Sequence, residues 1–319
     1  MIAVGASAGG VEALRALVSA LPADLDAAVC VVLHIPATGR SLLAPILDRY
    51  SALEAVVATN GMPLAAGRIY VAPADHHLLV EDDHVALGRG PKENGARPAV
   101  DPLLRSLARS WSSRAIAVIL SGSLDDGAAG AAAVAAVGGR VIVQEPGDAL
   151  VSSMPASALE AVPNAEILPV ARIGALLGRL HDPPSIDRQE PVVNPHPEPA
   201  ASPLASTRPA GPPSGFTCPE CHGPVWELKE GAIVRYRCRV GHAYSEQAMS
   251  DAQAGTVESA LWTALEVLQE RSELLTRIAD RLDGNGMPRS EHRFREEARE
   301  ASDRADAIRR VLAADEVRV

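Results

Sequence analysis

Short apolar runs alternate with helix-like stretches through residues 1–180, and this alternation is the strongest constraint on the fold. The runs read MIAV (1–4), AAVCVVL (27–33), RIYVA (68–72), AIAVIL (115–120) and GRVIVQ (139–144). Between several of them lie helical patterns such as GGVEALRALVSAL and DGAAGAAAVAAVG. Near-continuous apolar strands alternating with helices are typical of a parallel sheet covered on both faces. The pattern therefore predicts an α/β domain with a doubly wound, mostly parallel sheet over residues 1–180.

One segment of this region differs from the strand–helix units. HHLLVEDDHVAL (76–87) contains two short apolar runs around EDD. Two short strands around a polar turn form a β-hairpin. We therefore expect a hairpin here, on the edge of the sheet.

Three further regions follow the α/β domain. Proline is so dense between residues 183 and 213 that this stretch cannot bury a core, and we expect a disordered linker over 181–215. A compact Cys/His segment occupies 216–245. Residues 246–319 carry apolar side chains spaced by three and four positions on both sides of a DGNG turn. This spacing predicts an antiparallel helical hairpin over 246–319.

Charge and hydropathy exclude several classes of protein. The formal net charge of −10 argues against a general nucleic-acid binder. No apolar run reaches the roughly 18–20 residues of a membrane span, and the N-terminus lacks the basic start of a signal peptide. Of four cysteines, Cys30 lies in an apolar run and three cluster late, which suits a reducing compartment better than disulfides. We therefore expect a cytoplasmic protein without membrane insertion.

Polar residues follow three of the expected strands. MIAV runs into Gly5–Gly9, which reads G-x-S-x-G between strand and helix and has Ser7 at its centre. His34 follows the second run, and Asp125 and Asp126 follow AIAVIL. The carboxyl ends of the strands are where chemistry gathers in a doubly wound sheet. A serine, a histidine and an aspartate at that edge supply the nucleophile, base and orienting carboxylate of a serine hydrolase.

Each of these residues also has a structural interpretation. A serine in a Gly-rich turn is often a helix cap or part of a phosphate-binding loop, and Asp125 and Asp126 can cap the helix that starts at Gly127. Dinucleotide binding is the weaker alternative, because the glycines read G-x-x-x-G-G and the second strand ends in His34 where an acidic residue is required. The spacing does not choose between Asp125 and Asp126.

Six ordered motifs within residues 1–165 point to one family. They are VGASAGG, VVLHIP, IYVAPADHHLLV, RPAVDPLLRSL, VILSGSLDDGAAG and VSSMPASAL. In this order they resemble the motifs of CheB-type protein-glutamate methylesterases of bacterial chemotaxis. The resemblance implies that Ser7 is the nucleophile, His34 the base, and Asp126 the carboxylate that orients the base. It also implies hydrolysis of γ-glutamyl methyl esters on the cytoplasmic helices of chemoreceptors, with release of methanol, and deamidation of glutamine in some members.

The sequence departs from the family pattern at several positions. Family members usually carry Thr after the nucleophile, where this chain has Ala8. They usually read G-M-G-x-D-G where this chain has GSLDDG (122–127). These differences bear on rate and substrate choice. Well-studied members also have an N-terminal receiver domain that a phosphorelay phosphorylates. This sequence begins at the first strand of the catalytic domain, so we expect that control not to operate in cis.

The Cys/His segment has the spacing of a metal site. Cys218 and Cys221 form C-x2-C, and Cys238 and His242 form C-x3-H after a strand-like run. Three cysteines and one histidine suit tetrahedral Zn²⁺ in a closed, structural site, so the sequence predicts a zinc-ribbon-like module and no catalytic cofactor. The alternative is a group of reduced cysteines packed as small apolar side chains. His222 is an alternative fourth ligand, although its position beside Cys221 makes this geometrically awkward.

Two classes of function compete for the whole chain. The leading hypothesis is an esterase that acts on methylated receptor helices. The alternative is a catalytically weakened signalling scaffold that acts through the zinc module and the helical hairpin. In either case, a methyltransferase or another signalling protein is a candidate partner of the C-terminal modules. The sequence does not decide whether the zinc module contacts the active site.

Overall fold

The computed structural model describes residues 1–38, 41–179, 209–230, 233–284 and 287–316. The chain divides into two compact units, Met1–Met249 and Ser250–Val319. Most of the segment expected to be a linker, 181–215, lies outside the described residues. Within the part of this segment that is described, a β-strand begins at Pro213.

A seven-stranded sheet forms the centre of the first unit. Its order is β3–β4–β2–β1–β7–β8–β9, and every neighbouring pair is parallel. The five predicted strands are β1 (Ile2–Ala6), β2 (Val29–Leu33), β4 (Arg68–Val71), β7 (Ile116–Ile119) and β8 (Arg140–Gln144). The chain builds outward from β1 through β2 on one side and then crosses to β7 on the other, so the prediction of a doubly wound parallel sheet is confirmed.

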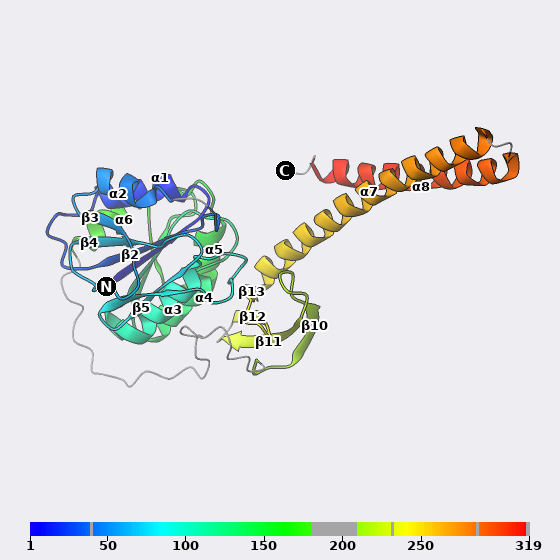
Figure 1. Ribbon diagram of the computed structural model, residues 1–319. Coiled ribbons are helices and arrows are strands. Elements are labelled where there is room, and N and C mark those ends of the chain that lie inside the picture. The colour runs from blue at the N-terminus through cyan, green and yellow to red at the C-terminus, as the bar shows by residue number, and fades with distance from the viewer. Residues whose placement is uncertain (39–40, 180–208, 231–232, 285–286, 317–319) are drawn as a thin grey trace. The chain divides into compact units, whose positions relative to one another are not determined.

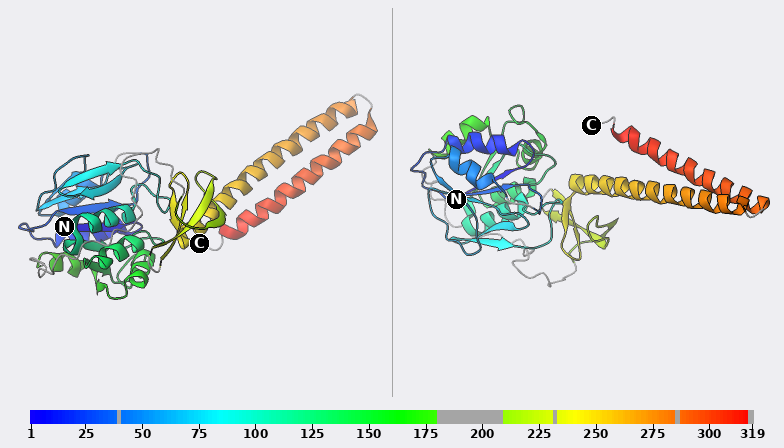
Figure 2. Two further views of the ribbon diagram at one scale, coloured as in Figure 1. Left: turned by 90° about the horizontal axis from the view of Figure 1, so that it is seen from below. Right: turned by 45° about the horizontal axis from the view of Figure 1, so that its top comes forward.

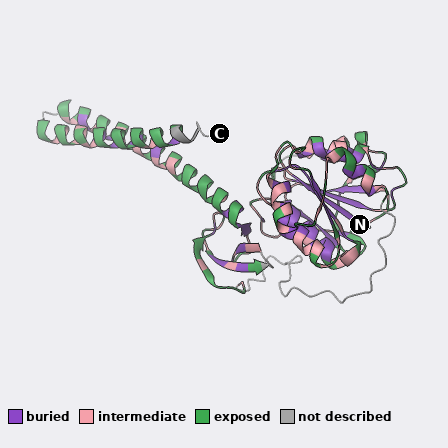
Figure 3. Cartoon of the chain, turned by 180° about the vertical axis from the view of Figure 1, so that it is seen from behind, coloured by how far each residue is buried: buried purple, intermediate pink, exposed green. Residues whose placement is uncertain are grey.

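Helices cover both faces of this sheet (Figure 1). One face packs against α1 (Gly10–Ser19), α2 (Leu43–Tyr50) and α6 (Val170–Leu177). The other packs against α3 (Val100–Trp111), with the short 3₁₀ turn η1 (Ser112–Arg114) after it, α4 (Ala128–Ala136) and α5 (Ser153–Ala161). Alternate residues of β1 enter the two cores, because side chains of a strand point to opposite faces. The central strands β1 and β2 are accordingly buried along their whole length (Figure 3).

The two edge strands carry no comparable apolar run. These are β3 (Glu54–Val57) and β9 (Glu166–Leu168). Glu54 and Val57 are exposed, and Ile167 at the opposite edge is exposed as well. Short, half-solvated edge strands lack the continuous Val/Ile/Leu signature, so they cannot be recognised from the sequence pattern.

The predicted hairpin forms, but its expected position is wrong. Strands β5 (His77–Glu81) and β6 (His84–Gly88) pair with each other in a separate two-stranded sheet. Helix α3 satisfies the backbone of β5, because Val80 N–H donates to Ser106 Oγ (2.9 Å) and Ser110 Oγ donates to Val80 C=O (2.9 Å). The hairpin therefore packs on a helix and does not extend the main sheet.

The Cys/His segment forms a four-stranded antiparallel sheet. Its strands, in order, are β10 (Pro213–Thr217), β11 (Pro224–Glu230), β12 (Ile233–Cys238) and β13 (Ala243–Ser245). We call this sheet with its turns the ribbon, residues 213–245. It belongs to the same compact unit as the α/β domain.

The second unit is a helical hairpin, as the spacing predicts. Helices α7 (Glu246–Gly284) and α8 (Pro288–Glu316) run antiparallel (Figure 2). Small and aliphatic side chains, among them Leu265 and Ala305, are buried between them, and Ser272 Oγ donates to the Ala298 carbonyl (2.9 Å). No helix in the described residues is both long and apolar enough to cross a membrane.

Candidate active site and metal cluster

The turn between β1 and α1 presents Ser7 at the carboxyl end of the sheet. Ser7 N–H donates to the Ser121 carbonyl (2.9 Å), and Gly10 N–H donates to the Ser7 carbonyl (2.8 Å). Gly9 has φ of +73°, and a Cβ atom there would lie 2.7 Å from Ser121 Oγ. Glycine is required at this position both by the left-handed backbone and by the lack of space.

The structure brings Ser7, His34 and Asp126 together. His34 follows β2, and its Nδ1 lies 3.0 Å from Ser7 Oγ. Its Nε2 lies 2.6 Å from Oδ2 of Asp126, which follows β7. The His34 side chain is 19% exposed and the Asp126 side chain 1% exposed. The three residues singled out from the sequence thus form one hydrogen-bonded chain at the ends of three adjacent strands.

The hydrogen bonds assign the two ring nitrogens of His34. An ionised carboxylate can only accept, so Nε2 carries the proton and donates to Asp126. Nδ1 then has a free lone pair that accepts the Ser7 hydroxyl proton. The imidazole is therefore arranged to remove a proton from Ser7.

The carboxylate of Asp126 is held by the start of α3. Its Oδ2 accepts from Val100 N–H (2.6 Å), and its Oδ1 accepts from Asp101 N–H (3.1 Å) and Asn94 Nδ2 (3.1 Å). Burial acts to raise the pKa of Asp126, but the hydrogen bond and charge of His34 and the two backbone N–H groups outweigh it and lower that pKa. Asp126 is consequently ionised and fixed in orientation.

A second buried aspartate complements this arrangement. Asp101 Oδ1 accepts from Gly127 N–H (3.0 Å) and Gly130 N–H (2.8 Å) at the start of α4. Asp126 and Asp101 therefore cap each other's helices. Burial, together with the neighbouring Asp126 carboxylate, raises the pKa of Asp101 to about 7 against the opposing effect of Arg235.

Sequence reasoning missed Asp101 and Asn94. Asp101 lies in the quoted motif RPAVDPLLRSL, and an acidic residue in a first helical turn is a recognisable signal. Its partners lie about 26 residues further along the chain, so the signal does not show what it contacts. Asp125, which the spacing could not separate from Asp126, instead accepts from Ser245 Oγ (2.6 Å).

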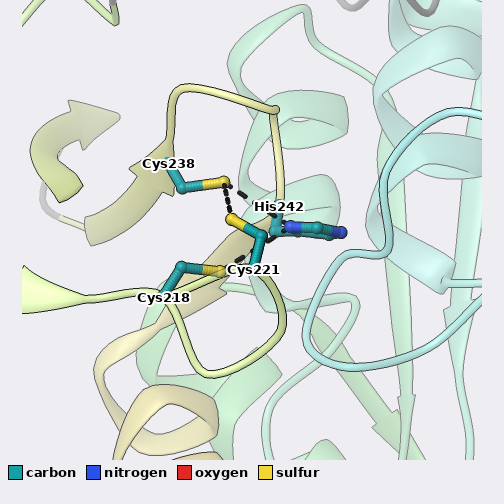
Figure 4. Close-up of side chains that lie close together, drawn as sticks. All are labelled: Cys218, Cys221, Cys238 and His242. Atoms are coloured by element: carbon teal, nitrogen blue, oxygen red, sulfur yellow. Dashed lines mark hydrogen bonds between the residues drawn. The ribbon is translucent and has the colours of Figure 1, made fainter. Parts of the chain in front are cut away.

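The four predicted metal ligands also converge (Figure 4). Their ligand atoms all lie within 4.8 Å of one another. His242 Nδ1 is 3.7 Å from Cys218 Sγ and 3.5 Å from Cys238 Sγ, and Cys221 Sγ is 3.6 Å from Cys238 Sγ. A tetrahedron with Zn–S of about 2.3 Å and Zn–N of about 2.0 Å has edges of roughly 3.5–3.8 Å. The donor set and its spacing therefore fit Zn²⁺.

The remaining candidates lie outside this cluster. Among the described residues, the convergent group includes His242 and not His222, which is exposed at a left-handed turn position (φ +54°). Cys30 is buried in β2, and burial raises the pKa of its thiol to about 12. Cys30 is thus a core residue.

Comparison with known proteins places the α/β domain in a family. The family model of the CheB methylesterase matches residues 2–177. The chain belongs to this family. The matched range contains Ser7, His34 and Asp126 and ends before the ribbon.

Curated relatives and a solved structure agree with this membership. The protein-glutamate methylesterase/protein-glutamine glutaminase 1 of Paramagnetospirillum magneticum is 38% identical over 185 residues, covering 56% of this chain and 49% of the relative. Protein-glutamate methylesterase/protein-glutamine glutaminase 2 of Caulobacter vibrioides is 38% identical over 178 residues, covering 54% and 51%. The chain thus spans about half the length of these relatives. The crystal structure of the Thermotoga maritima CheB methylesterase catalytic domain matches with a TM-score of 0.54 and 35% identity, over 56% of this chain and 97% of that domain.

Proposed function

We propose that the chain is a protein-glutamate methylesterase that acts on γ-glutamyl methyl esters of chemoreceptor helices in the cytoplasm, with glutamine deamidation as a related activity. The observation that carries this proposal is the hydrogen-bonded chain from Ser7 through His34 to Asp126. The names of the curated relatives support the substrate class.

The geometry supports an acyl-enzyme route. Ser7 Oγ attacks the ester carbonyl carbon while its proton passes to His34 Nδ1. The tetrahedral intermediate collapses, and methanol leaves with the proton that His34 returns. Water, activated by His34, then attacks the acyl-enzyme, frees the glutamate and restores the Ser7 hydroxyl. Asp126 stabilises the imidazolium that forms in each half of the cycle.

Backbone groups beside Ser7 are the candidates to stabilise the oxyanion. The N–H of Ala8 and the start of α1 lie next to the nucleophile, where the helix dipole favours negative charge. Gly122 packs under the turn, since a Cβ atom there would lie 2.9 Å from Ser7 Cβ. Ala8 is exposed and lacks the hydroxyl that the family usually has, so we expect it to alter substrate preference more than proton transfer.

Methanol release from methylated receptor segments tests this proposal. Ser7→Ala and His34→Ala should lower the rate by about 10³-fold or more while the circular dichroism spectrum stays unchanged. The exposed Ser19→Ala and His84→Ala are matched controls that should retain the wild-type rate. Full methanol release by Ser7→Ala would reject the esterase, and full signalling activity without methanol release would favour the scaffold.

We also propose that Cys218, Cys221, Cys238 and His242 bind one structural Zn²⁺. Three thiolates and one imidazole close the tetrahedral shell, so the ion would hold the two turns of the ribbon together and offer no position to substrate. Metal analysis of the purified chain should find about one zinc per molecule. Cys221→Ser should lose it and Cys30→Ser should keep it, whereas equal metal content in both variants would refute the assignment.

A further inference from the structure

The ribbon contacts the loop that carries the partners of Asp126. Glu93 and Ala243 form a parallel β-bridge. Asn94 N–H donates to the Ala243 carbonyl (2.8 Å), and Ala243 N–H donates to the Lys92 carbonyl (3.3 Å). Residues 92–94 of the α/β domain therefore lie along β13 and are held by it through their backbone.

A relay of hydrogen bonds leads from β13 to the carboxylate of Asp126. Ser245 N–H donates to Asn94 Oδ1 (3.0 Å), which turns the Asn94 Nδ2 group toward Asp126 Oδ1 (3.1 Å). Ser245 Oγ donates to Asp125, the neighbour of Asp126 in the chain (2.6 Å). Ser245 thus orients both the Asn94 amide, which donates to Asp126, and the turn that contains Asp125 and Asp126.

The ribbon also supplies a buried cation beside these carboxylates. Arg235 of β12 lies with Nη2 2.7 Å from Glu93 Oε2 and Nη1 3.3 Å from Asp101 Oδ2. Its side chain is 3% exposed. Arg105 of α3 also binds Glu93 through both carboxylate oxygens (2.7 and 2.8 Å), but its distance to Asp101 is 3.9 Å. Glu93, Asp101 and Asp126 are all buried. Arg105 of α3 offsets part of the negative charge of this cluster, and Arg235 of the ribbon offsets more of it.

The metal cluster fixes the strands from which both side chains come. Arg235 lies three residues before Cys238, and Ser245 lies three residues after His242. Binding of one ion by Cys238 and His242 would lock the turn between β12 and β13, and with it the placement of Arg235 and Ser245.

We propose that the metal-bound ribbon is a working part of the esterase site, in which Arg235 and Ser245 are positioning residues that hold Asp126 against His34. The catalytic consequence rests on the proposed function, whereas the positioning is a property of the fold. Zinc occupancy then controls the esterase through the placement of Asp126. The class of regulator implied is anything that removes Zn²⁺ or oxidises its thiolate ligands.

The positioning is tested in the full chain labelled with ¹⁵N-histidine. The Nε2–H proton of His34, hydrogen-bonded to a buried carboxylate, should give a downfield resonance that His34→Ala removes. Arg235→Gln should shift it upfield or broaden it, and Arg235→Lys, which keeps the charge, should restore it in part. The exposed Arg239→Gln on the same ribbon is the matched control and should leave it unchanged. Zinc content is measured in every variant.

Activity is read in parallel as the rate at which a fluorophosphonate labels Ser7 and as methanol release. We expect Arg235→Gln and chelation of zinc to lower labelling and kcat about tenfold or more with KM unchanged. If Arg235→Gln does not fold, the same measurements on Ser245→Ala test the positioning role. Ser245→Ala removes the hydrogen bond to Asp125, and Ser245→Thr, which keeps a hydroxyl, should restore the wild-type behaviour.

The outcomes separate the two proposals. Absence of labelling in the wild type, or equal labelling of Ser7→Ala, overturns the proposed function, while the His34 resonance still reports on positioning. A wild-type resonance and rate in Arg235→Gln and Ser245→Ala, or in the zinc-free chain, overturns the positioning role.

Discussion

Asp101 and Asp126 are two buried aspartates that cap each other's helices, yet their pKa values are shifted in opposite directions. Asp126 accepts four hydrogen bonds, one of them from His34. Asp101 accepts two backbone N–H groups at α4, and its second oxygen accepts from Asn94 Nδ2 (3.3 Å) and lies 3.3 Å from Arg235 Nη1. Burial and the neighbouring Asp126 carboxylate raise the pKa of Asp101, which lowers its tendency to ionise. The ionised form is therefore favoured at Asp126 and disfavoured at Asp101.

This difference predicts how stability depends on pH. A folded-state pKa of about 7 for Asp101 lies above the unfolded value of about 3.9, so its contribution to stability is complete below pH 4 and is lost as the pH rises to 7. Asp101→Asn keeps an oxygen for the α4 cap but does not ionise. Relative to this variant, the wild type should lose about 2–4 kcal/mol of unfolding free energy between pH 4 and pH 8.

Urea unfolding at several pH values between 4 and 8 measures this difference. The exposed Asp24→Asn is the matched control. If the wild type and Asp101→Asn differ by the same free energy at every pH, Asp101 does not titrate in this range.

Leu124 adopts a backbone conformation that its side chain disfavours. Its φ is +61°, at a position where the family motif has glycine. A left-handed conformation costs a non-glycine residue roughly 1–2 kcal/mol. Replacement by glycine removes this strain, but the greater freedom of glycine in the unfolded chain cancels about 0.5–1 kcal/mol of the gain. Leu124→Gly should therefore be more stable than Leu124→Ala by about 0.5–1 kcal/mol in urea unfolding. The opposite order would show that the turn is not strained.

Two residues of the proposed triad, Ser7 and His34, could be placed from the sequence because each directly follows a buried strand. Ser7 and His34 follow recognisable apolar runs, and parallel topology forces such ends together. The choice of Asp126 over Asp125 needed the family resemblance. Asn94 lies in a loop with no periodic pattern, and its role depends on Ser245, which is 151 residues away. Local sequence carries no signal for a contact of that kind.

Among whole elements, the central strands could be predicted from the sequence, whereas the peripheral elements could not be predicted or placed correctly. The five buried strands were predicted from their composition, whereas β3 and β9 were not, because edge strands need less apolar surface. The β5–β6 hairpin was predicted as a hairpin but misplaced. Its location depends on two serines of α3, Ser106 and Ser110, which bind the backbone of Val80.

Ser106 should therefore be important for docking this hairpin. Ser106→Ala leaves the N–H of Val80 buried without its acceptor, which should cost about 1–3 kcal/mol of unfolding free energy. The exposed Ser19→Ala should change stability by less than about 0.5 kcal/mol. Hydrogen exchange of the Val80 amide should accelerate in Ser106→Ala. Unchanged exchange would mean that β5 holds its place without the serine.

On the scale of the whole molecule, the ribbon and the α/β domain share one buried ion cluster. Arg235 comes from the ribbon, Glu93 from a loop of the α/β domain and Arg105 from α3. Separating the two parts would expose or leave unpaired several charges at once, which is costly. Residues 1–249 should accordingly unfold in one cooperative transition, although the sequence places a long proline-rich segment between the two parts.

Zinc removal tests this cooperativity by calorimetry. If the ribbon unfolds when the metal is chelated, Glu93 and Asp101 lose Arg235 as an ion-pair partner, and the transition of the α/β domain should move to a lower temperature. A loss of about 2 kcal/mol corresponds to a fall in Tm of roughly 4–8 °C for a unit of this size. The same chelator added to Cys221→Ser, which lacks a ligand, should cause no further shift. A main transition that stays in place while a small separate one disappears would show that the ribbon folds independently, and the coupling between metal and triad would fail with it.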